Sequence, residues 1–91
     1  MELKIIRRRE DFLELEASDE DPSIFDSLSE LMLKMEGVEY AGITIEHPLT
    51  KKVIIRVKTD PSKLKADMAL RRAAESLKIL SKELREKFEN L

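Results

Sequence analysis

The last third of the chain constrains the fold most strongly, because it is a long stretch, from about Leu64 to Leu91, without glycine or proline. Its apolar residues recur at alternating steps of three and four, with a leucine at every seventh position: Ala66, Leu70, Ala73, Leu77, Leu80, Leu84 and Leu91. This spacing predicts one long amphipathic helix. A helix of ~26 residues would be about 39 Å long, more than a small domain needs to cover one sheet. We therefore expect part of this helix to cover a surface other than the domain's own sheet.

Two short alternating stretches open the chain. Residues 2–8 and 12–17 both carry the alternation of apolar and charged side chains that is typical of half-buried strands. Arg9-Glu10-Asp11 between them is a short polar connection, which favours a hairpin. The acidic run from Ser18 to Asp21 then ends the second strand.

A first helix is predicted to begin at Asp21-Pro22. An aspartate side chain can accept the free amides of the first turn, and a proline at the first helical position has no amide to leave unpaired. Gly37 supplies the left-handed conformation that commonly ends a helix. Leu33 is either an exposed apolar residue or a second contact surface, because it lies off the inner face of this helix. That face comprises Ile24, Phe25, Leu28, Leu31, Met32 and Met35.

A second pair of strands is predicted at residues 38–46 and 52–59, which are rich in β-branched and aromatic side chains. Residues 47–51 between them are too many for a two-residue turn and include Pro48, which breaks strand pairing, so we interpret them as a loop. Asp60 or Ser62 is then positioned to cap the long helix.

The order β-β-α-β-β-α predicts an α+β fold of two layers, a four-stranded, mainly antiparallel sheet with both helices on one face. Without a linker, repeat or low-complexity segment, residues 1–91 are interpreted as a single domain. We expect the strands to contribute these core residues: Leu3, Ile5, Leu13, Leu15, Ile43, Ile45, Val53, Ile55 and Val57.

Composition excludes several classes of protein. A domain of 91 residues buries only about 60–65% of the surface of its unfolded chain, so a partner often completes it. The net charge of −2 gives no overall field that would attract nucleic acid or an anionic membrane. The absence of cysteine excludes disulfides and fits a reducing compartment. Without a signal peptide or an apolar run of ~20 residues, we expect a soluble, cytoplasmic protein.

Few residues indicate chemistry. His47 is the only histidine, and without a second histidine or a cysteine, a turn histidine with local hydrogen bonds is favoured over a metal ligand or a base. Two glycines cannot build a phosphate-binding loop. Asp19, Glu20 and Asp21 could hold Mg²⁺ or act as acid and base, but carboxylates just before a helix more often cap it. We predict no catalytic residue, no metal and no cofactor.

Three basic runs, at residues 7–9, 51–52 and 71–72, could form a patch for phosphate contacts. Acidic residues are scattered close to them, and the strands carry no aromatic pair on which bases could stack. These runs are interpreted as solvated surface, with nucleic-acid binding as an alternative.

Apolar helical surface exceeds what the small core needs. A heptad in a lone helix usually marks an ordinary core face, but here the last turns have no sheet beneath them, which favours a contact with another protein. The predicted partner interface comprises the apolar faces of both helices: Ile24, Phe25, Leu28, Leu31, Met32, Met35, Leu70, Ala73, Leu77, Leu80, Leu84, Phe88 and Leu91.

Several segments together resemble one family. The more specific are Glu46-His47-Pro48-Leu49 and Lys58-Thr59-Asp60, and the others are residues 1–6, 12–16, 20–21 and 38–42. In this order and spacing they are similar to archaeal RNA polymerase subunit L, the family of smaller alpha-like assembly subunits. The smaller assembly subunits of eukaryotic nuclear polymerases and the N-terminal dimerisation domain of the bacterial alpha subunit are related to it.

The resemblance implies a non-catalytic, alpha-like dimerisation domain that heterodimerises through its two helices with the larger alpha-like RNA polymerase subunit, designated D in archaea. The pair would be the platform on which the two large catalytic subunits of DNA-dependent RNA polymerase assemble, and the domain would meet DNA only through that complex. Two positions of the first helix differ from the family pattern, with Pro22 in place of a histidine and Phe25 in place of a small residue.

Two alternatives stay open. One is a divergent paralogue outside polymerase that associates with itself or with a different partner. The other is a small nucleic-acid-binding domain, whose signature would be salt-dependent binding to oligonucleotides.

Overall fold

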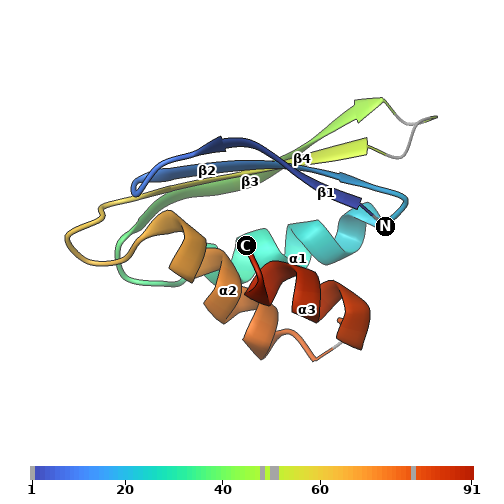
Figure 1. The fold of residues 1–91 in the computed structure, drawn as a ribbon. Coiled ribbons are helices and arrows are strands. Elements are labelled where there is room, and N and C mark those ends of the chain that lie inside the picture. The colour runs from blue at the N-terminus through green and yellow to red at the C-terminus, as the bar shows by residue number, and fades with distance from the viewer. Residues whose placement is uncertain (1, 48, 50–51, 79) are drawn as a thin grey trace.

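A computed structural model describes residues 2–47, 49, 52–78 and 80–91. In this part of the chain, four strands form one sheet, and three helices lie against one face of it (Figure 1). The predicted α+β fold, with helices on one side of an antiparallel sheet, is confirmed. The elements are β1 (Glu2–Arg8), β2 (Phe12–Ser18), α1 (Pro22–Leu33), β3 (Val38–His47), β4 (Lys52–Thr59), α2 (Ala66–Ser76) and α3 (Lys82–Glu89).

The sheet has the strand order β1-β2-β4-β3, and each neighbouring pair is antiparallel. β1 and β2 form the predicted hairpin, in which the amide of Arg9 donates to the carbonyl of Phe12 at 2.7 Å. His47, predicted in the loop, is the last residue of β3 and is paired with Lys52. The other loop residues, apart from Leu49, lie outside the described part of the chain: Pro48, Thr50 and Lys51.

The face of the sheet beneath which the helices lie carries the core. The strand residues buried there as predicted are at most 1% exposed: Leu13, Leu15, Val53, Ile55 and Val57. Leu3 and Ile43 are only partly buried against them. The core prediction is wrong for Ile5 and Ile45, which are 44% and 49% exposed. Both lie on edge strands, β1 and β3, at the margins of the layer that the helices cover.

The start of α1 agrees with the sequence prediction. Oδ1 of Asp21 accepts a hydrogen bond from the amide of Ser23 at 3.0 Å, and Pro22 takes the first helical position. Beyond α1, the chain turns through Gly37 at φ = 97°, a conformation that glycine adopts without steric cost. An added Cβ there would lie 2.9 Å from Cβ of Lys63, so this turn also needs the space that glycine leaves.

The prediction of one long C-terminal helix is wrong, because the chain interrupts it between α2 and α3. Leu77 ends α2 with an extended ψ of 99°, and Ser81 caps α3 by accepting the amide of Leu84 at 3.2 Å. The interruption lets α3 fold back beside α2 (Figure 1), where Leu84 and Phe88 are 2% and 0% exposed. Burying these side chains in the chain's own core offsets the helical hydrogen bonds that are lost at the break.

The start of α2 also differs from the prediction. Asp60 caps its own turn, accepting the amide of Ser62 at 3.1 Å, instead of capping a helix. α2 begins later, at Ala66, after Lys65, which makes no side-chain capping bond.

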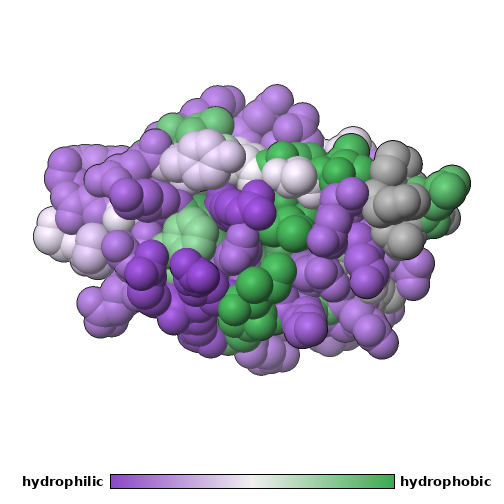
Figure 2. Space-filling view, turned by 90° about the horizontal axis from the view of Figure 1, so that it is seen from above, coloured by the Kyte–Doolittle hydropathy of each residue, from purple (hydrophilic) through white to green (hydrophobic). Residues whose placement is uncertain are grey.

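The opposite face of the sheet is directed to solvent. Figure 2, which looks down on this face, shows a largely hydrophilic surface with hydrophobic groups interspersed. Arg56 in β4 bridges two neighbouring strands, since its Nε donates to Glu14 Oε2 in β2 at 2.6 Å and its Nη1 donates to Thr44 Oγ1 in β3 at 3.0 Å.

Candidate protein interface

Several of the described carboxylates serve as caps or ion-pair partners. No three His, Asp or Glu side chains in this part of the chain are grouped so as to hold a metal ion. The amide of Ser23 lowers the pKa of the Asp21 carboxyl, and the hydroxyl of Ser62, followed by its amide, lowers that of Asp60. Both carboxylates thus act in local backbone turns. The side chain of His47 lies outside the described structure.

Each of the three basic runs has a member paired with a carboxylate. Nε of Arg9 lies 3.6 Å from Asp11, and Nζ of Lys52 lies 4.0 Å from Glu16. Exposed ion pairs of this kind contribute little to stability, but they reduce the positive charge that phosphate binding needs.

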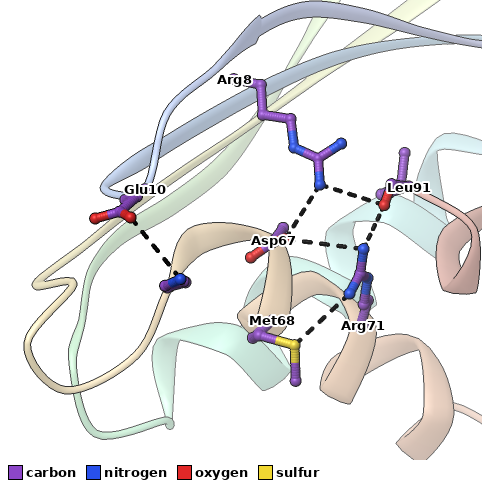
Figure 3. Close-up of polar contacts among 7 residues, drawn as sticks. Arg8, Glu10, Asp67, Met68, Arg71 and Leu91 are labelled. Atoms are coloured by element: carbon purple, nitrogen blue, oxygen red, sulfur yellow. Dashed lines mark hydrogen bonds and ion pairs between the residues drawn. The ribbon is translucent and has the colours of Figure 1, made fainter.

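The third run supplies Arg71 to a polar cluster that joins β1, α2 and the end of the chain after α3 (Figure 3). Nη2 of Arg8 donates to Asp67 Oδ2 at 3.2 Å and to the carbonyl of Leu91 at 3.3 Å. Arg71 donates to the same carbonyl and lies 3.8 Å from Asp67 Oδ2. Two cations beside the C-terminal end of α3 also complement its dipole. This cluster holds the end of α3 against α2 and β1.

The predicted interface residues divide into two sets. One set lies inside the chain's own core, each member at most 6% exposed: Phe25, Leu28, Met32, Leu70, Ala73, Leu80, Leu84 and Phe88. The other, here called the half-buried set, packs against the core and keeps part of its surface exposed: Ile24, Leu31, Met35, Leu77 and Leu91. The folded chain offers the half-buried set to a partner directly, and the buried set only if its helices rearrange.

Phe25 and Phe88 join α1 to α3. Their ring centroids lie 6.3 Å apart with an interplanar angle of 77°, an edge-to-face arrangement that aromatic pairs favour. Each ring is 0% exposed. Phe25, which differs from the small residue of the resembled family, therefore fills the contact between α1 and the folded-back α3.

Some exposed apolar side chains lie outside the predicted interface. Leu33 is 52% exposed and follows Leu31 by two positions, which places it on another side of α1. Tyr40 in β3 and Ile6 in β1 are 50% and 45% exposed. The predicted interface does not include Met68, because this residue lies off the seven-residue pattern. Met68 packs against the core, and its sulfur accepts a hydrogen bond from Nη1 of Arg71 at 3.8 Å. The sequence signal for this contact was the spacing of three residues between Met68 and Arg71, which places both side chains on the same side of a helix.

A groove of about 750 Å³ separates α3 from the edge of the sheet. Leu3 and Ile5 of β1 line one side, and Glu83 and Glu86 of α3 line the other. The groove explains the exposure of Ile5, since α3 does not reach far enough to cover it.

In the described part of the chain, the helices are too short or too polar to cross a membrane.

Comparison with known proteins gives one consistent result. The sequence profile of the RNA polymerase Rpb3/Rpb11 dimerisation domain matches residues 13–87, from β2 into α3. The DNA-directed RNA polymerase subunit Rpo11 of Saccharolobus shibatae is 35% identical over 81 residues, which cover 89% of this chain and 87% of that protein. Rpo11 of Thermococcus kodakarensis is 38% identical over 79 residues, covering 85% and 83%.

A solved structure shows the same fold. The crystal structure of DNA-directed RNA polymerase subunit L from Thermoplasma acidophilum superposes on the chain with a TM-score of 0.72 and 26% identity. The superposition covers 98% of this chain and 86% of that one, so the similarity extends over the sheet and the helices together.

Proposed function

The chain belongs to the family of RNA polymerase Rpb3/Rpb11 dimerisation domains, and on this premise we propose that it is a non-catalytic assembly subunit of a DNA-dependent RNA polymerase. In this role it heterodimerises with the larger alpha-like subunit, the one designated D in archaea. The pair forms the platform on which the large catalytic subunits assemble. DNA is reached only through the complex.

The observation that carries this proposal is apolar surface on the helical side of a chain whose family is defined by dimerisation. Ile24 and Leu31 in α1 lie seven residues apart, which places them on one side of the helix, and both remain partly exposed. Leu77 lies at the end of α2 and is partly exposed as well. A partner that removes the exposed part of these apolar side chains from water stabilises the pair in proportion to the area that it covers.

The interface in this proposal consists of the half-buried set, with the buried set behind it. The outer face of the sheet is a weaker choice, because Arg56 donates hydrogen bonds to both Glu14 and Thr44 across it. The paired basic side chains Arg9 and Lys52 likewise favour contact with protein over contact with DNA.

The test is co-expression of the chain with the larger alpha-like subunit of the same genome, followed by affinity capture and measurement of the dissociation constant. Leu31→Asp should weaken pairing at least tenfold, about 1.4 kcal/mol, because it places a charge in the apolar contact. Leu33→Asp is the matched control, the same substitution on another side of the same helix, and should leave pairing unchanged. Circular dichroism verifies that both variants are folded.

Three outcomes would count against the proposal. A wild-type chain that forms only homodimers and never captures the alpha-like subunit would indicate the paralogue outside polymerase. Salt-dependent binding to oligonucleotides without subunit capture would indicate the nucleic-acid-binding domain. Loss of pairing in Leu33→Asp alone would move the interface to the other side of α1.

A further inference from the structure

The seven-residue spacing of leucines continues unchanged across the break between α2 and α3. Leucines recur every seven residues at Leu70, Leu77, Leu84 and Leu91, two before α3 and two within or after it. Separate helices do not need a shared phase, since each can orient its apolar side independently. Residues 77–81 contain neither glycine nor proline, so an unbroken helix can accommodate them. The same segment is therefore compatible with a second arrangement, one continuous helix.

The described residues at the break carry few features that fix it. α2 ends at Leu77 without the glycine that usually terminates a helix and without a basic residue in its last turn. On the other side, Ser81 caps α3, and Nη2 of Arg85 donates to the carbonyl of Leu77 at 3.1 Å. These contacts are local to the junction, so they give way together if α3 moves.

α3 is held by packing on its helical side and by hydrogen bonds at the end of the chain. Phe88 packs edge-to-face on Phe25 of α1, and the carbonyl of Leu91 accepts from Arg8 and Arg71. On the side towards β1, the groove of about 750 Å³ separates the helix from the sheet. A helix of 8 residues attached in this way is the element most readily released.

We propose that α3 is a built-in cover for the apolar face of α1, and that pairing displaces it, after which α2 and α3 join into one helix. This inference rests on the proposed function, because the displacing partner is the larger alpha-like subunit. Joined from Ala66 to Leu91, the helix would be about 39 Å long, close to the 38 Å longest extent of the whole domain. It would offer Leu77, Leu84 and Leu91 along one side and uncover Phe25 for the partner.

Lys82→Pro separates the two arrangements. In the folded-back chain, residue 82 is the first residue of α3, where proline is favoured, and Ser81 before it has φ = −65° and ψ = 157°, the geometry that a residue before proline adopts. In a continuous helix the same proline removes a backbone hydrogen bond and clashes with the preceding turn. The variant should keep the thermal stability of the free chain and bind the alpha-like subunit at least about 100-fold more weakly.

Two further variants sharpen this test. Lys82→Ala removes the same exposed side chain without affecting either arrangement, so it should pair like the wild type. Ser81→Ala removes the cap that only the folded-back form uses, and should tighten pairing by about fivefold.

A distance measurement detects the change directly. The chain has no cysteine, so spin labels on Glu75→Cys and Glu89→Cys report one distance. We expect this distance to change on addition of the alpha-like subunit and to reach about 21 Å, the length of 14 helical residues. If the wild type pairs while the distance stays constant and Lys82→Pro pairs equally well, the cover is refuted and the assembly function stands. If the wild type does not pair at all, the proposed function itself fails.

Discussion

Replacing Phe88 by alanine is expected to lower the free energy of unfolding of the free chain by about 3 kcal/mol. The ring is 0% exposed, and its centroid lies 6.3 Å from that of Phe25. Truncating a buried phenylalanine costs about 3–5 kcal/mol, and a site near the end of the chain, which can partly collapse, belongs at the low end of that range. For a domain of this size, the same loss lowers Tm by about 12–24 °C.

Urea denaturation followed by circular dichroism at 222 nm measures this loss. Glu86→Ala is the control on the same helix, and it should change stability by less than about 0.5 kcal/mol because that side chain is exposed. A cycle of Phe25→Leu, Phe88→Leu and the double variant should give a coupling of about 0.5–1.5 kcal/mol. A loss below about 1 kcal/mol for Phe88→Ala, without coupling, would refute the packing of α3 on α1, and the covering role would fail with it.

Two further predictions concern the turns around α1. Gly37→Ala should lower stability by about 1–2 kcal/mol, since it introduces a side chain at φ = 97° and brings a Cβ within 2.9 Å of Lys63; an unchanged Tm would contradict this. Asp21→Ala should be less stable than the wild type at neutral pH, with a difference that shrinks below about pH 4. The pKa of this carboxyl is lowered in the folded chain by the Ser23 amide, so its contribution is present above the unfolded pKa and is lost as pH falls through the folded one; a Tm difference that is constant down to pH 2 would contradict this assignment.

Local patterns were sufficient for most of the fold. Period-two alternation and β-branched or aromatic content located the four strands, and Asp21-Pro22 located the start of α1, because these signals depend on neighbouring residues in the chain. The spacing of Phe25, Leu28 and Met32 identified the buried side of α1 in the same way. The family was recognisable for a related reason, since short segments in a fixed order carry it.

The sequence pattern could not tell which residues of the candidate interface are available to a partner. Helical spacing identifies apolar side chains that leave water, but it does not say whether the same chain or a partner covers them. Leu84 and Phe88 were assigned to a partner and are covered by this chain, whereas Ile24 and Leu31 remain partly available. Pairing with the alpha-like subunit stays a prediction for both groups.

The sequence by itself determined the two strand pairs, the position of α1 and the apolar phase of the last 26 residues, because each follows from the type and spacing of neighbouring side chains. Only the tertiary structure decided the strand order, the exposure of Ile5 and Ile45 at the sheet edges, and the break before Ser81. The residues at that break permit a helix, so local preference leaves two conformations. The free chain adopts the broken one because it brings Phe88 onto Phe25, a contact between residues 63 positions apart.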